Sequence, residues 1–150
     1  MKKVFLLLVL TIITITTNSC SNDKDDSPVA EKTYGTISMK LNGVQKTLNV
    51  SYVKLIKNLE GTPDEYTQID IGTSPKNTDA VAFSFKKGDL GNIIVGFTYL
   101  KESDMGYSAE SDFLSDVTAN GDDKKLMGAF SGHLGGDEFN LTEGSFNIEY

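Results

Sequence analysis

The side chains that could perform chemistry in this chain are one histidine, one cysteine and 21 carboxylates. His133 lies two residues before the pair Gly135-Gly136, at the end of a predicted strand. A zinc site would require further histidines or free cysteines, and the sequence contains no Gly-x-Ser-x-Gly motif that would mark a serine nucleophile. We therefore expect His133 to be a surface residue next to a turn.

Pairs of acidic residues could serve glycoside hydrolysis if two carboxylates faced each other across a cleft. The consecutive acids are Asp64-Glu65, Asp122-Asp123 and Asp137-Glu138. All three pairs lie in turn sequences, where Asp favours bonds to the local backbone. A glycan hydrolase is therefore the least favoured of three function hypotheses, and we expect the chain not to be an enzyme.

Calcium is the most plausible metal, because it binds several oxygen ligands from loops. The weak candidate ligands are Asp122 and Asp123, which follow Asn120-Gly121, and Asp112 together with Asp116. No segment has the EF-hand loop pattern. We expect no cofactor and no specific metal site, and we keep these four acids as the candidates for calcium.

Cys20 is the only cysteine, so the chain has no internal disulfide. It follows Lys2 and Lys3, an apolar stretch over residues 4–15 that is too short to span a bilayer, and a small polar segment over residues 16–19. This order is typical of a secretory signal peptide. The sequence therefore predicts cleavage between Ser19 and Cys20.

Residues 17–20 resemble the lipobox of bacterial lipoprotein signal peptides. Thr17 stands at the position of the usual leucine, and Ser19 replaces the usual glycine or alanine, as is common in lipoproteins of the Bacteroidota. The resemblance implies acyl chains on Cys20, and two or more chains anchor a protein stably in a membrane.

The polar segment over residues 21–28 has the composition of a solvated tether. Within it, Lys24, Asp25 and Asp26 resemble the acidic export signal that directs Bacteroidota lipoproteins to the outer face of the outer membrane. We therefore expect a lipid anchor in the outer membrane at the cell surface. An acidic linker on the periplasmic face is the alternative.

The charge of the chain excludes one class of partner. The formal net charge is −7, there is no arginine, and removal of the leader with its two lysines leaves 12 lysines against 21 acids, a net charge of −9. Nucleic-acid binding requires clustered Lys and Arg, so no nucleic-acid partner is expected. Anionic membrane surfaces are repelled as well, so the predicted membrane contact is through the lipid alone.

The elements that must position these residues are β-strands, because apolar residues alternate with period two from about residue 34 onward. Strands are predicted at residues 36–41, 44–56, 66–72, 80–86, 92–100, 113–119, 126–134 and 138–150. Asn42-Gly43 predicts a tight hairpin. In the second strand, Leu48, Val50 and Tyr52 share one face before the pattern switches, which predicts a bulge over residues 51–53.

Residues 101–112 have the least regular pattern, with a loop predicted over 103–106 and a short helix over 108–115 as an open alternative. The predicted organisation is a signal peptide over residues 1–19, a lipidated tether over 20–33 and one all-β domain over 34–150. The predicted fold is an antiparallel β-sandwich or barrel-like sandwich of about eight or nine strands, since both architectures share the same period.

Both ends of the predicted domain resemble small Bacteroidota lipoprotein domains of unknown function. The resemblance lies in residues 39–43, which form the first strand and turn, and in two closing Gly-x-Phe segments, Gly128–Phe130 and Gly144–Phe146. Residues 44–46 contain no aromatic, although that family has one soon after the Asn-Gly pair. The resemblance implies a fold and a location but no activity.

The leading function hypothesis is a non-enzymatic surface module that binds or scaffolds a glycan, a peptide or an envelope protein. It predicts a contiguous exposed patch of Tyr and Phe on one face of the sheet. The alternative is a carrier of small apolar ligands, which requires an enclosed barrel cavity on the order of a few hundred Å³.

Overall fold

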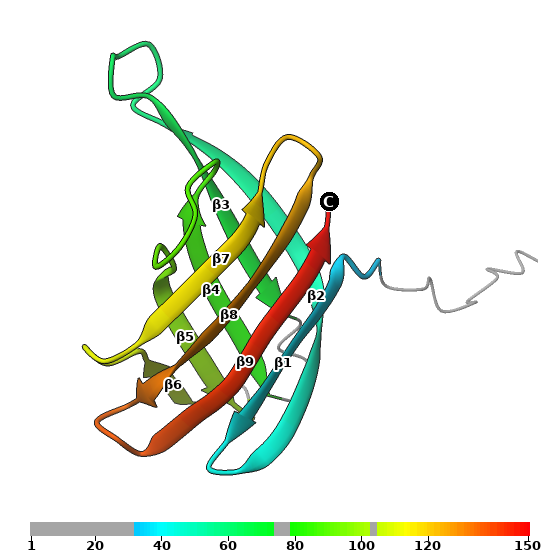
Figure 1. Cartoon of the computed structure of the whole chain (residues 1–150), viewed down its shortest axis with the longest axis vertical. Coiled ribbons are helices and arrows are strands. Elements are labelled where there is room, and N and C mark those ends of the chain that lie inside the picture. The colour runs from blue at the N-terminus through cyan, green and yellow to red at the C-terminus, as the bar shows by residue number, and fades with distance from the viewer. Residues whose placement is uncertain (1–31, 74–78, 103–104) are drawn as a thin grey trace, which may run out of the picture. The chain divides into compact units, whose positions relative to one another are not determined.

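A single antiparallel sheet makes up the folded part of the chain (Figure 1). The computed structural model describes residues 32–73, 79–102 and 105–150, and within these ranges it contains no helix. The strands are β1 (Gly35–Leu41), β2 (Val44–Asn58), β3 (Tyr66–Thr73), β4 (Ala80–Lys86), β5 (Val95–Lys101), β6 (Met105–Ser108), β7 (Leu114–Asn120), β8 (Lys125–Leu134) and β9 (Phe139–Glu149). The all-β prediction is confirmed.

The strand order is β6-β5-β4-β3-β2-β1-β9-β8-β7, and the sheet curls so that β7, β8 and β9 face β3, β4 and β5 (Figure 1). The architecture is therefore one curled, barrel-like sheet. The predicted leader, Cys20, Lys24, Asp25 and Asp26 lie outside the described residues.

The hairpin between β1 and β2 follows directly from its sequence. Leu41 pairs with Val44, and the two turn residues Asn42 and Gly43 have positive φ angles of 49° and 80°. Two consecutive residues with positive φ are the requirement of a type I′ turn, which Asn-Gly satisfies best. The predicted hairpin is confirmed.

The long strand β2 contains the expected bulge. Its pairing with β3 shifts between Val50 and Tyr52, so that Val50 faces the core while Val53 resumes the inward direction after the bulge. Tyr52 points outward, is 45% exposed and covers Gly72 of β3. The prediction of a bulge is confirmed, but placing Tyr52 on the same face as Val50 is wrong, because the extra residue of the bulge reverses the direction of the Tyr52 side chain.

The inside of the curl is filled by side chains. Alternate residues of the strands form one buried apolar cluster, in which the ring of Phe83 lies 5.9 Å from that of Phe97 and 5.5 Å from that of Phe146. Phe130 packs 5.0 Å from Phe97. Aromatic side chains from both walls therefore supply the bulky core that the sequence, which contains no Trp, would otherwise lack.

The segment between β5 and β7 joins the two edges of the sheet and differs from the prediction. Met105–Ser108 is strand β6 and not loop, and Ser108 pairs with Thr98 of β5. The next residue, Ala109, pairs with Leu134 of β8. The chain thus changes partner within one residue, and residues 108–115 form a bridge, a turn and the start of β7 in place of a helix.

The strand predicted from residue 92 begins only at Val95, because residues 90–94 run beside β7. Gly91 and Val117 exchange two backbone hydrogen bonds of 2.9 Å. Ser115 donates its backbone N–H to the Asn92 side chain over 2.8 Å. These contacts cover the outer edge of β7, which would otherwise present unpaired backbone groups.

Candidate functional site

Small, mostly polar side chains form two aligned rows on the outer face of β1, β9, β8 and β7. The strand register places Ser38 opposite Ser145, Ser145 opposite Ala129, and Ala129 opposite Asp116. The second row lies two residues further along the strands. In it, Thr36 pairs with Asn147, and Asn147 pairs with Met127. Thr118 completes this row, and its hydroxyl donates to the Met127 carbonyl over 3.4 Å. Each row therefore crosses four strands.

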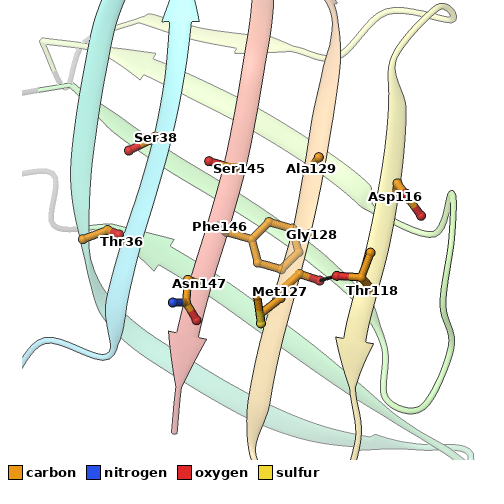
Figure 2. A pocket seen from close by; sticks show the side chains of 10 residues that line it. All are labelled: Thr36, Ser38, Asp116, Thr118, Met127, Gly128, Ala129, Ser145, Phe146 and Asn147. Carbon is orange, nitrogen blue, oxygen red and sulfur yellow. Dashed lines mark hydrogen bonds between the residues drawn. The ribbon is translucent and has the colours of Figure 1, made fainter.

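An open groove of about 350 Å³ lies between these two rows (Figure 2). Its walls carry four hydroxyls, one amide and one carboxylate, from Thr36, Ser38, Thr118, Ser145, Asn147 and Asp116. Met127, Ala129 and Gly128 supply its apolar part, and Phe146 borders it with its ring buried in the core. The side chain of Asp116 is the one charged group in this lining.

On the inner side of the sheet, glycines of β8 and β9 lie opposite phenylalanine rings. Gly128 pairs with Phe146, whose ring lies flat across it, and a Cβ at position 128 would stand 2.6 Å from Phe146 Cζ. Gly144 and Phe130 repeat the arrangement in the neighbouring pair. The two Gly-x-Phe segments are thus complementary, since each glycine accommodates the phenylalanine of the other strand. Aromatic rings of this kind compensate for the packing that strand glycines lack.

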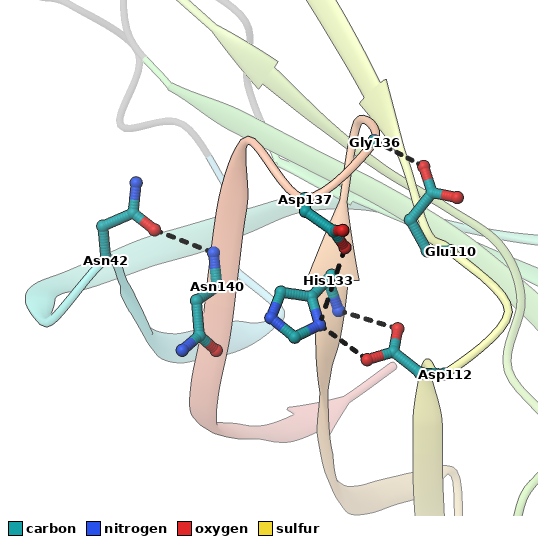
Figure 3. A network of polar contacts seen from close by, with 7 residues as sticks. All are labelled: Asn42, Glu110, Asp112, His133, Gly136, Asp137 and Asn140. Carbon is teal, nitrogen blue, oxygen red and sulfur yellow. Dashed lines mark hydrogen bonds and ion pairs between the residues drawn. The ribbon is translucent and has the colours of Figure 1, made fainter.

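His133 forms the centre of a second polar network, at the end of β8 (Figure 3). Its Nδ1 lies 2.6 Å from Oδ2 of Asp112, and its backbone N–H donates to Oδ1 of the same carboxylate over 3.1 Å. Oδ1 of Asp137 is 4.0 Å from Nδ1. The His133 side chain is 38% exposed, so it lies at the surface and also has a partner.

The pKa values of this pair shift in opposite directions. The hydrogen bond to Asp112 raises the pKa of His133 above its usual value, and the nearby charges of Asp112 and Asp137 act in the same direction. The hydrogen bond from His133 lowers the pKa of Asp112. Because both shifts favour the charged forms, the pair is a surface ion pair below the pKa of the histidine.

The network attaches the turn after β6 to the hairpin between β8 and β9. The Glu110 N–H donates to the His133 carbonyl over 2.9 Å, and the Gly136 N–H donates to Oε1 of Glu110 over 2.6 Å. Beside it, the Asn140 N–H donates to Oδ1 of Asn42 over 2.8 Å (Figure 3). These hydrogen bonds therefore connect neighbouring turns and hairpins to one another. Among the described residues, no group of three or more His, Cys, Asp or Glu side chains is arranged to hold a metal ion.

The four calcium candidates lie at separate places in the fold. Asp112 binds His133, and Asp116 lines the outer groove. Asp122 accepts from Nζ of Lys87 over 2.9 Å, which lowers its pKa, and Asp123 accepts from the Lys125 N–H over 3.3 Å. Asp112 lies before β7, whereas Asp122 and Asp123 lie after it, so the length of this strand separates them. The structure therefore does not bring the four together.

A half-buried polar cluster that the sequence analysis missed lies near the start of β4. Oδ2 of Asp79 is 2.6 Å from Nζ of Lys46, and Oδ1 accepts from the Glu102 N–H over 3.3 Å. Burial raises the pKa of Asp79, but its hydrogen bonds with Lys46, Tyr99 and the backbone together lower the pKa by more. The pKa of Asp79 therefore lies below the usual value. Burial and the Asp79 carboxylate raise the pKa of Tyr99. The cluster links β2 to the start of β4.

The predicted patch of Tyr and Phe on one face is wrong for the described residues. Tyr52 is the one aromatic among their exposed large apolar side chains, and the phenylalanines lie inside the curl or half-buried against it.

Sequence periodicity could identify the outward rows but could not locate the groove, because the strand order β1-β9-β8-β7 is not the order in sequence.

The described residues include no helix long and apolar enough to cross a membrane. No protein-family model matches the chain, and neither the curated proteins nor the solved structures include a match.

Proposed function

We propose that the chain is a cell-envelope lipoprotein whose folded domain is a non-enzymatic binding module, with the groove over β1, β9, β8 and β7 as its binding face. The location rests on the leader, on Cys20 as the acylation site, and on the acidic segment from Lys24 to Asp26. The membrane contact is the lipid anchor, and the partner is an extracellular glycan, a peptide or an envelope protein.

The groove is the observation that carries the binding proposal. Ligand sites in proteins are concave and combine apolar contacts with a few convergent polar groups. This groove combines apolar contacts from Met127 and Ala129 with polar side chains from three strands of the sheet, β1, β9 and β7. Rigid elements hold such groups in place without an ordering cost on binding.

The alternative functions draw less support from the described residues. A carrier requires an enclosed cavity, whereas packed aromatic side chains fill the inside of the curl. A glycan hydrolase requires two carboxylates facing each other in a cleft, whereas Asp116 is the one carboxylate in the groove lining. We therefore favour binding without catalysis.

The test is to fill the groove from one outward position. Ser145 is exposed in the first row, so a Ser145→Trp substitution places an indole in the groove without entering the core. Ser108→Trp is the matched control, since Ser108 is also an exposed strand serine but lies on β6, outside the groove lining. The full-length proteins are incubated with the polysaccharide fraction and the protein fraction of the envelope.

We expect the native protein and Ser108→Trp to bind the same fraction equally, and Ser145→Trp to bind it at least about tenfold more weakly, the loss that follows from blocking a central contact. Equal binding by all three proteins contradicts the assignment of the groove. Circular dichroism and thermal melts show whether both variants keep the fold of the native protein.

A further inference from the structure

The groove can recognise a ligand only through its side chains. Each of β1, β9 and β8 has a neighbour on both sides, and the outer edge of β7 is covered by Gly91 and Asn92. The backbone N–H and C=O groups beneath the groove are therefore engaged in the sheet. A peptide that binds by adding a strand needs a free sheet edge, which this face does not offer.

Hydroxyl and amide groups dominate the polar lining, and several are free to bind. Among the described residues, the side chains of Thr36, Ser145 and Asn147 form no hydrogen bond, while Ser38 contacts Thr47 over 3.2 Å at the surface. A hydroxyl both donates and accepts, and an amide supplies two donors and an acceptor. Such a lining complements a ligand that is itself rich in hydroxyls.

The charge of the groove favours a neutral ligand. Asp116 is the one charged side chain of the lining, and no lysine lines it to bind a carboxylate, sulfate or phosphate group. The chain as a whole is acidic. An anionic polymer would therefore be repelled, whereas Asp116 can accept two hydrogen bonds from neighbouring hydroxyls, and hydrogen bonds to an ionised acceptor are the stronger kind.

The shape of the groove fits a chain. Its lining crosses four strands, which span about 14 Å at the usual strand separation of about 4.8 Å. The groove is open, and Met127 and Ala129, one in each row, offer apolar contact beside the polar side chains. An extended ligand with alternating polar and C–H surfaces would contact both rows together.

From these observations we propose that the groove binds a neutral carbohydrate chain, with Asp116 as its strongest hydrogen-bond acceptor. This inference rests on the proposed function, because it names the ligand of the same binding face. Ser38, Ser145, Thr36 and Asn147 contact the sugar hydroxyls, and Met127 with Ala129 contacts the sugar rings.

The test uses defined glycans and the full-length protein. Affinity electrophoresis and titration calorimetry measure binding to dextran, soluble starch, laminarin and mannan as neutral probes, to polygalacturonate as an anionic probe, and to chitosan oligomers as a cationic probe. The variants are Asp116→Asn, Ser145→Trp and the control Ser108→Trp.

We expect at least one neutral glycan to bind the native protein and Ser108→Trp with the same Kd. Asp116→Asn should weaken that binding by about tenfold, the usual cost of losing hydrogen bonds to a charged acceptor, and Ser145→Trp by more. Asp116 is exposed, so its substitution is not expected to disturb the fold, and a thermal melt checks this.

Three outcomes overturn the carbohydrate assignment. The first is that no neutral glycan binds at millimolar concentration, and the second is that only polygalacturonate or chitosan binds. In either case the ligand assignment fails, and the proposed function stands if Ser145→Trp still abolishes binding to an envelope fraction. If a neutral glycan binds but Ser145→Trp has no effect, the groove is not the site, and both the inference and the proposed function fail.

Discussion

At the scale of single residues, the His133–Asp112 pair has a defined pH window. Since the folded pKa of His133 is raised above 6.5, its contribution to stability is present below the unfolded pKa and is lost as the pH rises through the folded pKa. The folded pKa of Asp112 is lowered below 3.8, so its contribution is lost as the pH falls through that pKa. The pair therefore stabilises the turn after β6 at pH values between the folded pKa of Asp112 and the folded pKa of His133.

A proton NMR titration tests the pair directly, because His133 is the only histidine and gives one set of imidazole signals. We expect a pKa above 6.5 in the native protein. Asp112→Asn should lower it clearly, since the hydrogen bond to this carboxylate is the largest cause of the shift. Asp137→Asn should lower it less, because its carboxylate is 4.0 Å away. An unchanged pKa in Asp112→Asn contradicts the pairing.

The sequence predicted the surface position of His133 but not its partner. Asp112 lies 21 residues earlier, in a segment without strand periodicity, and it reaches His133 only because Ala109 pairs with Leu134. Short-range patterns contain no information on such a contact. The Lys46–Asp79 pair was missed for the same reason.

At the scale of the elements, the inward glycines of β8 and β9 are positions where a single methyl group is costly. In Gly128→Ala, the added Cβ would stand 2.6 Å from Phe146 Cζ and 2.8 Å from the Asp116 carbonyl oxygen. Relieving this overlap requires the buried ring or a strand backbone to move. We expect Gly128→Ala to lower the free energy of unfolding by about 1–3 kcal/mol, as overpacking of a core usually does.

Urea denaturation measures this effect, with Gly121→Ala as the control. Gly121 lies in the hairpin after β7, where the nearest atom to an added Cβ is the Asp123 carboxylate at 3.4 Å. We expect the control to change the free energy of unfolding by less than about 0.5 kcal/mol. Equal midpoints for both variants would show that the ring of Phe146 does not press on Gly128.

Strands with a clear period or strong turn residues were predictable from sequence. Asn42-Gly43 determines the first hairpin, and the change of apolar phase near Val50 locates the bulge. β6 was not predictable, because its four residues are too few to show a period and Met105 and Gly106 have no strong strand preference.

At the scale of the whole molecule, Ser115 holds the seam at which residues 91–94 lie against the outer edge of β7. Its hydroxyl accepts from the N–H groups of Ile93 and Ile94 over 3.1 and 3.2 Å, and it is 8% exposed. In Ser115→Ala, the Ile93 N–H keeps the Gly91 carbonyl as an acceptor at 3.1 Å, whereas the Ile94 N–H is left without one. We expect a loss of about 1–3 kcal/mol in the free energy of unfolding, the cost of leaving a buried polar group unpaired.

Thermal unfolding checks this prediction, with Ser131→Ala as the control, since Ser131 is exposed on β8. Hydrogen exchange should also show faster exchange at Ile93 and Ile94 in Ser115→Ala. A variant as stable as the control would mean that the seam does not depend on this hydroxyl. The seam itself could not be predicted, because the pattern at residues 92–94 suggested a continuous strand.

The central claim is that an acylated Cys20 holds the folded domain outside the cell. The measurement is the intact mass of the protein from membranes, combined with protease treatment of whole cells, for the native chain and Cys20→Ala. We expect a mature native chain that begins at an acylated Cys20 and is cleaved by external protease, while Cys20→Ala has no acyl mass and does not accumulate at the surface. A native chain that keeps residues 1–19, or carries an unmodified Cys20, would contradict the claim.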